Sequence, residues 1–175
     1  MSNETKDLKH FIREIPDFPK PGILFYDITP LLADAKALPA AIDALCKPFA
    51  GENIDVVAAV EARGFIFGSA VARALNAGFV PIRKKGKLPF ETHSVSYGLE
   101  YGEDSVEVHS DAVAPGTKVL MVDDLLATGG TMAAACELIE NLGGEIAGLT
   151  FLIELADLNG CDLLKKYDIH TVIKY

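Results

Sequence analysis

Hydrophobic positions in the first fifty residues follow two patterns, separated by a proline-rich connection. Between residues 8 and 15, apolar side chains recur at i, i+3, i+4 and i+7, the spacing of an amphipathic helix. Three prolines and a glycine between residues 16 and 22 end that helix, because proline lacks the N–H that a continuing helix needs. Residues 23–28 form a short apolar segment of strand or loop type, and a second helix is predicted from about residue 38 to residue 49.

From residue 54 onwards, short apolar runs alternate with stretches of helical periodicity. Strands are predicted at residues 54–60, 79–82, 119–122, 146–153 and 169–173, and helices at about 65–76 and 131–142. Gly78 marks the expected C-cap of the first of these helices, and a Gly-Gly pair closes the second. The first strand is apolar at nearly every position, which is typical of a strand buried on both faces. The alternation predicts an α/β fold with a central, mainly parallel sheet flanked by helices.

Residues 87–109 follow a different period. Apolar residues alternate with small or polar ones on both sides of Gly102, which predicts an antiparallel hairpin or flap attached to the parallel sheet. We therefore expect one domain over residues 1–175, with an N-terminal cap of about residues 1–34 and a flap at about 87–109.

The charge balance limits the partners. The 175 residues carry 25 acidic side chains against 16 lysines and arginines, a net charge of −9, with 50% hydrophobic residues. This balance argues against binding of nucleic acid or an anionic membrane, but leaves room for a small anion held by a local basic cluster. The three cysteines include no CxxC pair and fit a reduced, cytoplasmic protein without disulfides or zinc. No signal peptide and no apolar run of about 18 residues is visible.

The strongest chemical signal lies in residues 119–131, Val-Leu-Met-Val-Asp-Asp-Leu-Leu-Ala-Thr-Gly-Gly-Thr. An apolar strand delivers Asp123 and Asp124 to its C-terminal end, and a Thr-Gly-Gly-Thr turn then opens a helix. Glycines let backbone N–H groups approach a phosphate at a helix N-terminus. Carboxylates beside that turn accept hydrogen bonds from vicinal hydroxyls, so the pattern predicts a ribose 5-phosphate site. The alternative is an ordinary strand-turn-helix with acidic turn residues.

Two further segments carry candidate anion ligands. Arg63 follows the buried strand and precedes Gly64, so it is predicted on a turn at the C-terminal edge of the sheet, where a guanidinium binds pyrophosphate well. Four cations then fall within five residues after the next strand: Arg83, Lys84, Lys85 and Lys87. The alternatives are a loop arginine in solvent and a solvated charged face.

Two side chains are candidates for contact with a base. Glu100 lies in the predicted flap, and a carboxyl enclosed there would have a raised pKa and could act as an acid; its alternative is an exposed hairpin glutamate. Phe25 could stack on a purine, or could pack in the core beside Ile23 and Ile28. The four histidines lack metal-ligand spacing. Cys136 lies in the predicted helix over 131–142 and is expected to be a packing residue.

Residues 119–131 resemble the phosphoribosyl-pyrophosphate motif of the type I phosphoribosyltransferases. Segments 17–28, 62–65, 82–89 and 97–102 resemble the adenine phosphoribosyltransferase family, in the same order and spacing from about Phe11 to the C-terminus. The resemblance implies the type I phosphoribosyltransferase fold, with a base-binding hood at about 1–34. It also implies purine salvage, in which adenine and phosphoribosyl pyrophosphate give AMP and pyrophosphate. Mg²⁺ is implied as cofactor, held through substrate oxygens and water with no direct protein ligand, and a homodimer is implied.

The resemblance also assigns residues. It places the phosphoribosyl group on Asp123, Asp124, Ala127, Thr128, Gly129, Gly130 and Thr131, and pyrophosphate on Arg63, Arg83, Lys84 and Lys87. Adenine stacks on Phe25, the backbone of Leu24 and Tyr26 reads its edge, and Tyr26 stands where several relatives have arginine. Glu100 is the catalytic acid at the purine N7, with Tyr101 beside it in the flap. A non-proline cis peptide is implied before Arg63.

Two alternatives to adenine salvage follow from the same residues. An oxopurine phosphoribosyltransferase would share the fold, and the backbone around Phe25 would decide between an amino and an oxo group. A non-catalytic regulator that senses phosphoribosyl pyrophosphate would need a DNA-contacting module. Only about 50 residues precede the first buried strand, and they carry no basic helix-turn-helix signal.

Overall fold

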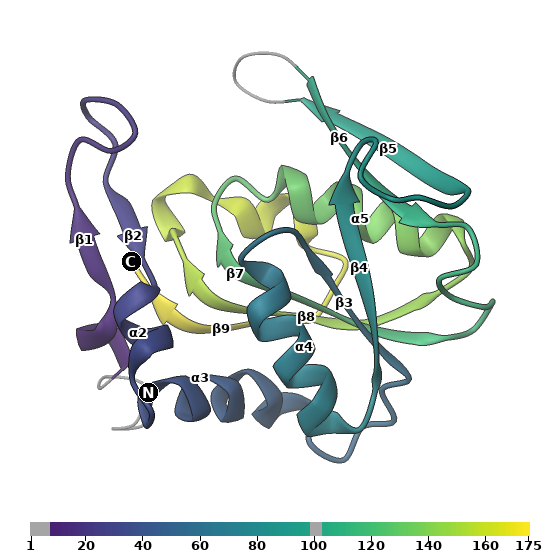
Figure 1. The fold of residues 1–175 in the computed structure, drawn as a ribbon, viewed down its shortest axis with the longest axis horizontal. Coiled ribbons are helices and arrows are strands. Elements are labelled where there is room, and N and C mark those ends of the chain that lie inside the picture. The colour runs from purple at the N-terminus through teal and green to yellow at the C-terminus, as the bar shows by residue number, and fades with distance from the viewer. Residues whose placement is uncertain (1–7, 99–102) are drawn as a thin grey trace.

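A seven-stranded sheet organises the chain in the computed structural model, which describes residues 8–98 and 103–175 (Figure 1). The strand order is β5-β6-β4-β3-β7-β8-β9, and the five strands from β4 to β9 in that order are parallel. Their bounds are Val56–Val60 for β3, Gly78–Lys84 for β4, Thr92–Gly98 for β5, Glu103–His109 for β6, Lys118–Leu126 for β7, Glu145–Glu154 for β8 and Ile169–Lys174 for β9. The predicted α/β fold with a mainly parallel sheet is confirmed, and β5 and β6 form the predicted antiparallel hairpin.

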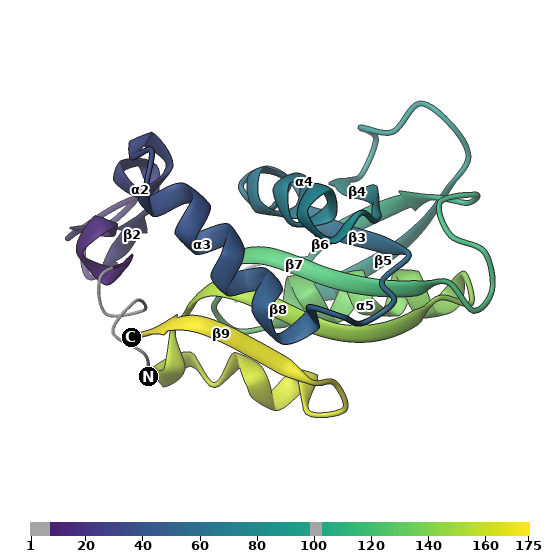
Figure 2. The same ribbon diagram turned by 90° about the horizontal axis from the view of Figure 1, so that it is seen from below.

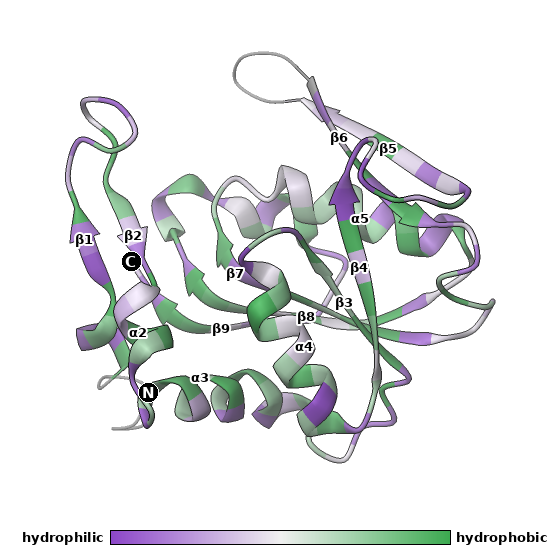
Figure 3. Cartoon of the chain, in the orientation of Figure 1, coloured by the Kyte–Doolittle hydropathy of each residue, from purple (hydrophilic) through white to green (hydrophobic). Residues whose placement is uncertain are grey.

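Helices cover both faces of this sheet (Figure 2). Helices α3 (Ala37–Cys46) and α4 (Gly64–Leu75) pack with one face of the central strands, and α5 (Gly130–Asn141) packs with the other. Alternating strand residues point to opposite faces, so Val57 and Leu120 join the first core and Ala58 and Met121 the second. Figure 3 shows this as hydrophobic colouring along the central strands and the helix sides that face them.

The N-terminal region corrects the sequence prediction. The apolar spacing over residues 8–15 predicted a helix, but within this range only Leu8 and the 3₁₀ turn Lys9–Phe11 are helical. The chain then extends into β1 (Arg13–Ile15), which pairs antiparallel with β2 (Phe25–Asp27) in a separate two-stranded sheet. Pairing with β2 overrides the local helical period, because these backbone groups find their partners across the proline turn. A short helix, α2 (Thr29–Ala33), was not predicted.

Other boundaries differ in smaller ways. The predicted helix over 38–49 is α3 followed by a 3₁₀ turn, Lys47–Phe49. The C-cap of α4 is Asn76, in the left-handed conformation at φ +56°, and not Gly78, which begins β4. Strand β7 continues through Leu126, so the paired aspartates lie inside the strand. Two 3₁₀ turns after β8, Ala156–Leu158 and Gly160–Leu164, carry no apolar periodicity and were missed. No helix in the described part of the chain is long and apolar enough to cross a membrane.

Candidate active site

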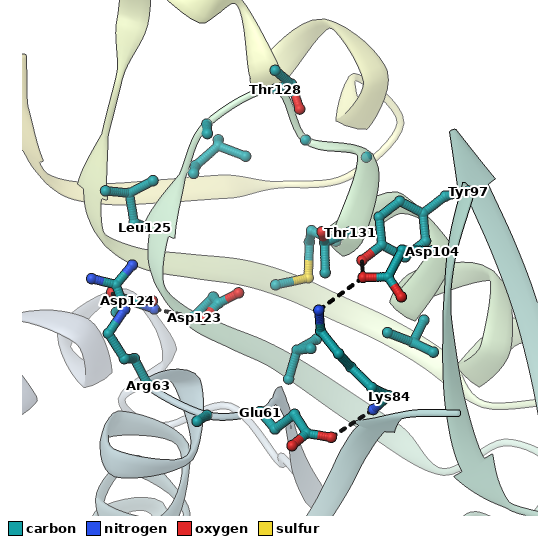
Figure 4. A pocket seen from close by; sticks show the side chains of 18 residues that line it. Glu61, Arg63, Lys84, Tyr97, Asp104, Asp123, Asp124, Leu125, Thr128 and Thr131 are labelled. Atoms are coloured by element: carbon teal, nitrogen blue, oxygen red, sulfur yellow. Dashed lines mark hydrogen bonds and ion pairs between the residues drawn. The ribbon is translucent and has the colours of Figure 1, made fainter. Parts of the chain in front are cut away.

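The carboxyl ends of β3, β4 and β7 enclose a cavity of about 570 Å³ (Figure 4). In open α/β sheets this edge is where ligands bind, since the loops that leave parallel strands diverge there. The wall contains the predicted residues Arg63, Lys84, Asp123 and Asp124 together with Ala127, Thr128, Gly129, Gly130 and Thr131. Segments separated by about sixty residues in the sequence therefore meet at one site.

The loop between β7 and α5 has the geometry of an anion site. Gly129 is the N-cap of α5 and adopts φ +85°, a conformation that glycine adopts without steric cost. The N-terminus of the twelve-residue helix α5 directs unpaired N–H groups toward the cavity. A Cβ on Gly129 would lie 2.5 Å from the carbonyl oxygen of Gly160. Gly160 therefore packs directly against this loop. The two glycines are about thirty residues apart, so no local sequence pattern predicts the contact.

Asp123 and Asp124 form a closely coupled carboxylate pair at the back of the cavity. The backbone N–H of Asp124 donates to Asp123 Oδ1 at 2.9 Å. Asp123 keeps some exposure toward the cavity, yet burial raises its pKa well above the usual range, and the neighbouring Asp124 carboxylate raises it further. Burial also raises the pKa of Asp124, against the opposing effect of Arg63. A Cβ on Gly64 would lie 2.6 Å from Asp123 Oδ1, so glycine lets α4 approach the pair.

Each of the predicted pyrophosphate ligands already pairs with a carboxylate. Arg63 Nε lies 3.0 Å from Asp124 Oδ2. Lys84 Nζ lies 2.9 Å from Asp104 Oδ2. A dashed line marks this ion pair in Figure 4. Arg83 and Lys87 both lie 3.2 Å from Glu61 Oε2. Of these four cations only Arg63 and Lys84 line the main cavity. Arg83 and Lys87 lie behind Glu61, which itself lines the cavity.

Glu61 and Asp104 are site residues that the sequence reasoning missed. Glu61 accepts the Lys84 backbone N–H at 2.6 Å in addition to its two ion pairs. Burial raises the pKa of Glu61, but the hydrogen bonds from Lys84, Lys87 and Arg83 outweigh that effect and leave the pKa lowered. The hydrogen bond from Lys84 likewise lowers the pKa of Asp104. The useful sequence signal was an excess of cations in one segment, since buried carboxylates nearby are the usual means of holding such a cluster.

A second, apolar cavity of about 420 Å³ adjoins the first and shares Arg63 with it. Its wall comes from the N-terminal sheet, α2 and α4: Ile15, Phe18, Phe25, Asp27, Ile28, Thr29, Leu32, Arg63 and Ile66. The Phe25 ring lies edge-to-face against Phe18 with centroids 5.1 Å apart, and the Arg63 guanidinium lies 5.3 Å from its centroid. Phe25 is half-buried and faces this cavity, so the interpretation of Phe25 as a core residue is wrong.

The remaining predicted residues are distributed differently. Leu24 and Tyr26 flank Phe25 but are absent from the lining of the apolar cavity, and the Tyr26 ring turns instead to Tyr175. Glu100 and Tyr101 lie outside the described residues. The strands that lead to them place Tyr97 and Asp104 in the cavity wall, with the Tyr97 hydroxyl donating to Asp104 at 3.3 Å. The Glu61–Ala62 peptide bond, in the turn before Arg63, is cis.

Magnesium fits this donor set only in part. Among the described residues there is no group of three His, Cys, Asp or Glu side chains arranged to hold a metal ion. The two cavity carboxylates supply hard oxygen donors, and Mg²⁺ usually combines one or two such groups with substrate phosphates and water. The residues therefore suit an ion that arrives with its substrate.

Comparisons with known proteins agree with this geometry. The family model for the phosphoribosyl transferase domain matches residues 25–174, so the chain belongs to the phosphoribosyltransferases. Within that class it belongs to the adenine phosphoribosyltransferase family. The adenine phosphoribosyltransferase of Rhodopirellula baltica is 58% identical over 169 residues, covering 97% of this chain and 82% of the relative. That of Koribacter versatilis is 58% identical over 168 residues, covering 96% and 92%.

Solved structures give the same family. The crystal structure of adenine phosphoribosyltransferase from Thermoanaerobacter pseudethanolicus matches with a TM-score of 0.95 at 54% identity, covering 98% of this chain and 99% of the other. The Saccharomyces cerevisiae enzyme, crystallised with an imino-altritol bisphosphate and adenine, matches with a TM-score of 0.93 at 39% identity, covering 98% and 99%. The chain is thus an enzyme of pentosyl transfer.

Proposed function

We propose that the protein salvages adenine by transferring the phosphoribosyl group of phosphoribosyl pyrophosphate to it, which yields AMP and pyrophosphate. The observation that carries this proposal is the junction of two unlike cavities at Arg63. One cavity has a glycine loop, two carboxylates and several cations, and the other is apolar with an aromatic wall. A charged sugar phosphate and a planar base bound side by side need these two environments.

The polar cavity suits the phosphoribosyl group. The backbone N–H groups and hydroxyls of residues 127–131 bind the 5-phosphate at the start of α5, where the helix dipole favours an anion. Asp123 and Asp124 accept hydrogen bonds from the ribose hydroxyls. Their pKa values are raised because the two neighbouring carboxyls are buried in an enclosed site. Hydrogen bonds donated by the substrate hydroxyls would stabilise the charged carboxylates.

Pyrophosphate binds at the cations that now pair with carboxylates. Arg63 and Lys84 reach it from the cavity wall, and Arg83 and Lys87 reach it from the cluster at Glu61. Pyrophosphate must compete with Asp124, Asp104 and Glu61 for these partners, so binding exchanges ion pairs and leaves no buried cation unpaired.

Adenine occupies the apolar cavity and stacks on Phe25. Base–aromatic stacking contributes about 1–3 kcal/mol per base in nucleic-acid systems. The backbone groups of Leu24 and Tyr26 read the base edge, since the Tyr26 side chain is engaged with Tyr175 on the opposite side of the strand.

The reaction forms a bond from the purine nitrogen to the anomeric carbon while the bond from that carbon to pyrophosphate breaks. The transition state resembles an oxocarbenium ion, and no protein nucleophile is needed because the purine attacks. The site holds both reactants in line and neutralises the charge on the departing pyrophosphate. Mg²⁺ that arrives with the substrate would supply Lewis-acid neutralisation of the pyrophosphate charge, beside the carboxylates of Asp123 and Asp124. Glu100 acts as the acid at the purine N7, and the flap that carries it and Tyr101 keeps water from the activated sugar.

A substrate panel tests the proposal. Purified protein with Mg²⁺ and phosphoribosyl pyrophosphate is assayed with adenine, hypoxanthine, guanine and xanthine, and we expect adenine to be strongly preferred. An amino and an oxo group demand opposite hydrogen-bond partners, which makes the preference large. Preferential turnover of an oxopurine would instead show a different base specificity, and no turnover of any base would favour a sensor without catalytic activity.

The role of Glu100 is tested by Glu100→Gln. Loss of a positioned acid lowers turnover by roughly 10²–10⁴-fold, and we expect a fall in that range in steady-state assays. Glu91→Gln, an exposed glutamate before β5, serves as the control and should leave turnover unchanged. Equal turnover in Glu100→Gln and the wild type would remove Glu100 from the mechanism.

We also propose a cytoplasmic homodimer. All three cysteines are free thiols, which fits a reducing compartment. The dimer rests on the family, in which pyrophosphate ligands often act across the subunit interface. Light scattering on the purified 18.7 kDa chain should give twice the monomer mass, and a monomeric mass at assay concentrations would contradict the proposal.

A further inference from the structure

The two-stranded sheet of β1 and β2, called here the small sheet, presents two different faces. Phe25 faces the apolar cavity and Tyr26, its neighbour in β2, faces the opposite way. The small sheet makes no ladder hydrogen bonds with the seven-stranded sheet in the described part of the chain. An isolated pair of strands is marginally stable, so its position depends on side-chain packing.

The far face of the small sheet meets Tyr175. The Tyr26 and Tyr175 rings lie with centroids 4.2 Å apart, at 44° to each other. Figure 1 shows the corresponding end of the chain beside β2. Both rings also pack against the core beneath α3. Burial raises the pKa of Tyr26 and raises that of Tyr175 to about 12, so both phenols are neutral at physiological pH.

Tyr175 is itself held firmly to the large sheet. Its backbone N–H donates to Glu154 at 3.0 Å, and its carbonyl accepts from Ala156 at 2.8 Å, directly after β9. Lys9 adds a further tie, with Nζ 3.8 Å from the Tyr175 ring centroid and 3.3 Å from the Lys174 carbonyl oxygen. The ring is therefore a fixed point against which the small sheet rests.

We infer that Tyr175 is a positioning residue for the base: by holding Tyr26, it sets the position of Phe25 in the apolar cavity. This inference rests on the proposed function, because Phe25 is there the surface on which adenine stacks. Residues 123–131 belong to other elements, so the phosphoribosyl site does not depend on this contact. The inference predicts an effect on the base alone.

The test compares Tyr175→Ala with Tyr175→Phe. An aromatic pair contributes enough to shift an equilibrium by roughly two- to twelvefold, and we expect Tyr175→Ala to raise the KM for adenine by a factor in that range. The KM for phosphoribosyl pyrophosphate should change less than about twofold, because its ligands lie elsewhere. Tyr175→Phe keeps the ring and should restore the wild-type values.

A second measurement reads the small sheet directly. Amide hydrogen exchange of residues 13–27 should accelerate in Tyr175→Ala, while exchange in β3 and β7 stays unchanged. Tyr167→Ala is the matched control, since Tyr167 is a partly buried tyrosine packed with the opposite core. It should lower overall stability without separating the two Michaelis constants.

Three outcomes would overturn the inference: unchanged exchange in residues 13–27, an unchanged KM for adenine in Tyr175→Ala, or an equal rise in both Michaelis constants. Failure of the proposed function is distinguishable. If the wild type used another purine, the same split measured with that purine and the exchange data would still decide the role of Tyr175. If it used no base, exchange alone would show whether the contact holds the small sheet, and the positioning of a base would be overturned with the function.

Discussion

Asp123→Asn should raise the thermal stability of the free protein while removing most of its turnover. Burial and the adjacent Asp124 carboxylate raise the pKa of Asp123, so its negative charge destabilises the folded state at neutral pH. Asparagine keeps an oxygen that can accept the Asp124 N–H now bound at 2.9 Å. In a domain of this size, each kcal/mol of relieved destabilisation raises Tm by roughly 2–4 °C.

The pH dependence gives the sign of this effect. A carboxyl whose pKa is higher in the folded than in the unfolded protein binds more protons when folded, so stability falls as pH rises above the unfolded value of about 3.9. The advantage of Asp123→Asn should therefore be absent below about pH 4, grow as the pH rises from there to the raised pKa of Asp123, and stay constant above that pKa. Calorimetry over this range measures the difference in Tm.

Catalysis should respond in the opposite direction. A hydrogen bond to a charged acceptor contributes about 1.5–3 kcal/mol, so loss of the Asp123 charge should cost roughly 10–100-fold in kcat/KM. The loss should appear with every purine, because the ribose hydroxyls are common to all of the reactions.

Asp27→Asn is the matched comparison. Asp27 is also buried, but hydrogen bonds from the Thr29 backbone and hydroxyl, with help from Arg13, lower its pKa. Its charge stabilises the fold above about pH 4, and this contribution is lost as pH falls through the lowered pKa. Asp27→Asn should therefore lower Tm at pH 7. A lower Tm in Asp123→Asn at pH 7 would contradict the charge argument.

The contrast between these two aspartates shows how far sequence reasoning extends. Motif spacing located Asp123 and Asp124 and predicted the turn that follows, because strand, carboxylates and glycines are contiguous. Asp27 was not predicted as a buried charge, since its partner Thr29 belongs to a hydrogen-bonding turn that has no periodic signature. The sheet was predictable for the same local reason, as each central strand is a short apolar run between glycines or polar residues.

Features that depend on long-range pairing escaped prediction. The segment over residues 8–15 has helical spacing, yet the backbone of its residues 13–15 pairs with β2, ten to fourteen residues further along the chain. Glu61, in the turn after β3, and Asp104, in β6, pair with the cations of residues 83–87, and nothing in either local sequence marks these two carboxylates. The cation cluster itself was visible because its members are adjacent. Site residues that are adjacent in the sequence can be predicted from their pattern, whereas partners that only folding brings together cannot.

Gly160→Ala should produce the largest loss of phosphate binding of any substitution outside the cavity wall. A Cβ at Gly160 would collide with the Ala127 carbonyl oxygen and come within 3.1 Å of the Gly129 backbone nitrogen. Both contacts are with backbone, so relief requires the phosphate loop itself to move. Such overpacking costs typically 1–3 kcal/mol, which corresponds to roughly a 5- to 150-fold loss of affinity for ribose 5-phosphate.

Titration calorimetry with ribose 5-phosphate and steady-state kinetics measure this loss. We expect the KM for phosphoribosyl pyrophosphate to rise, with little change in the KM for adenine, because the apolar cavity does not contact Gly160. Gly78→Ala is the control: its Cβ would lie 3.5 Å from Val56 Cγ2, which is an ordinary contact. Gly78 begins β4, at the end of the strand opposite to the cavity. A folded Gly160→Ala protein that binds ribose 5-phosphate like the wild type would show that the loop does not depend on the backbone beneath it. The expected split instead ties phosphate recognition to a glycine thirty residues beyond the recognisable motif.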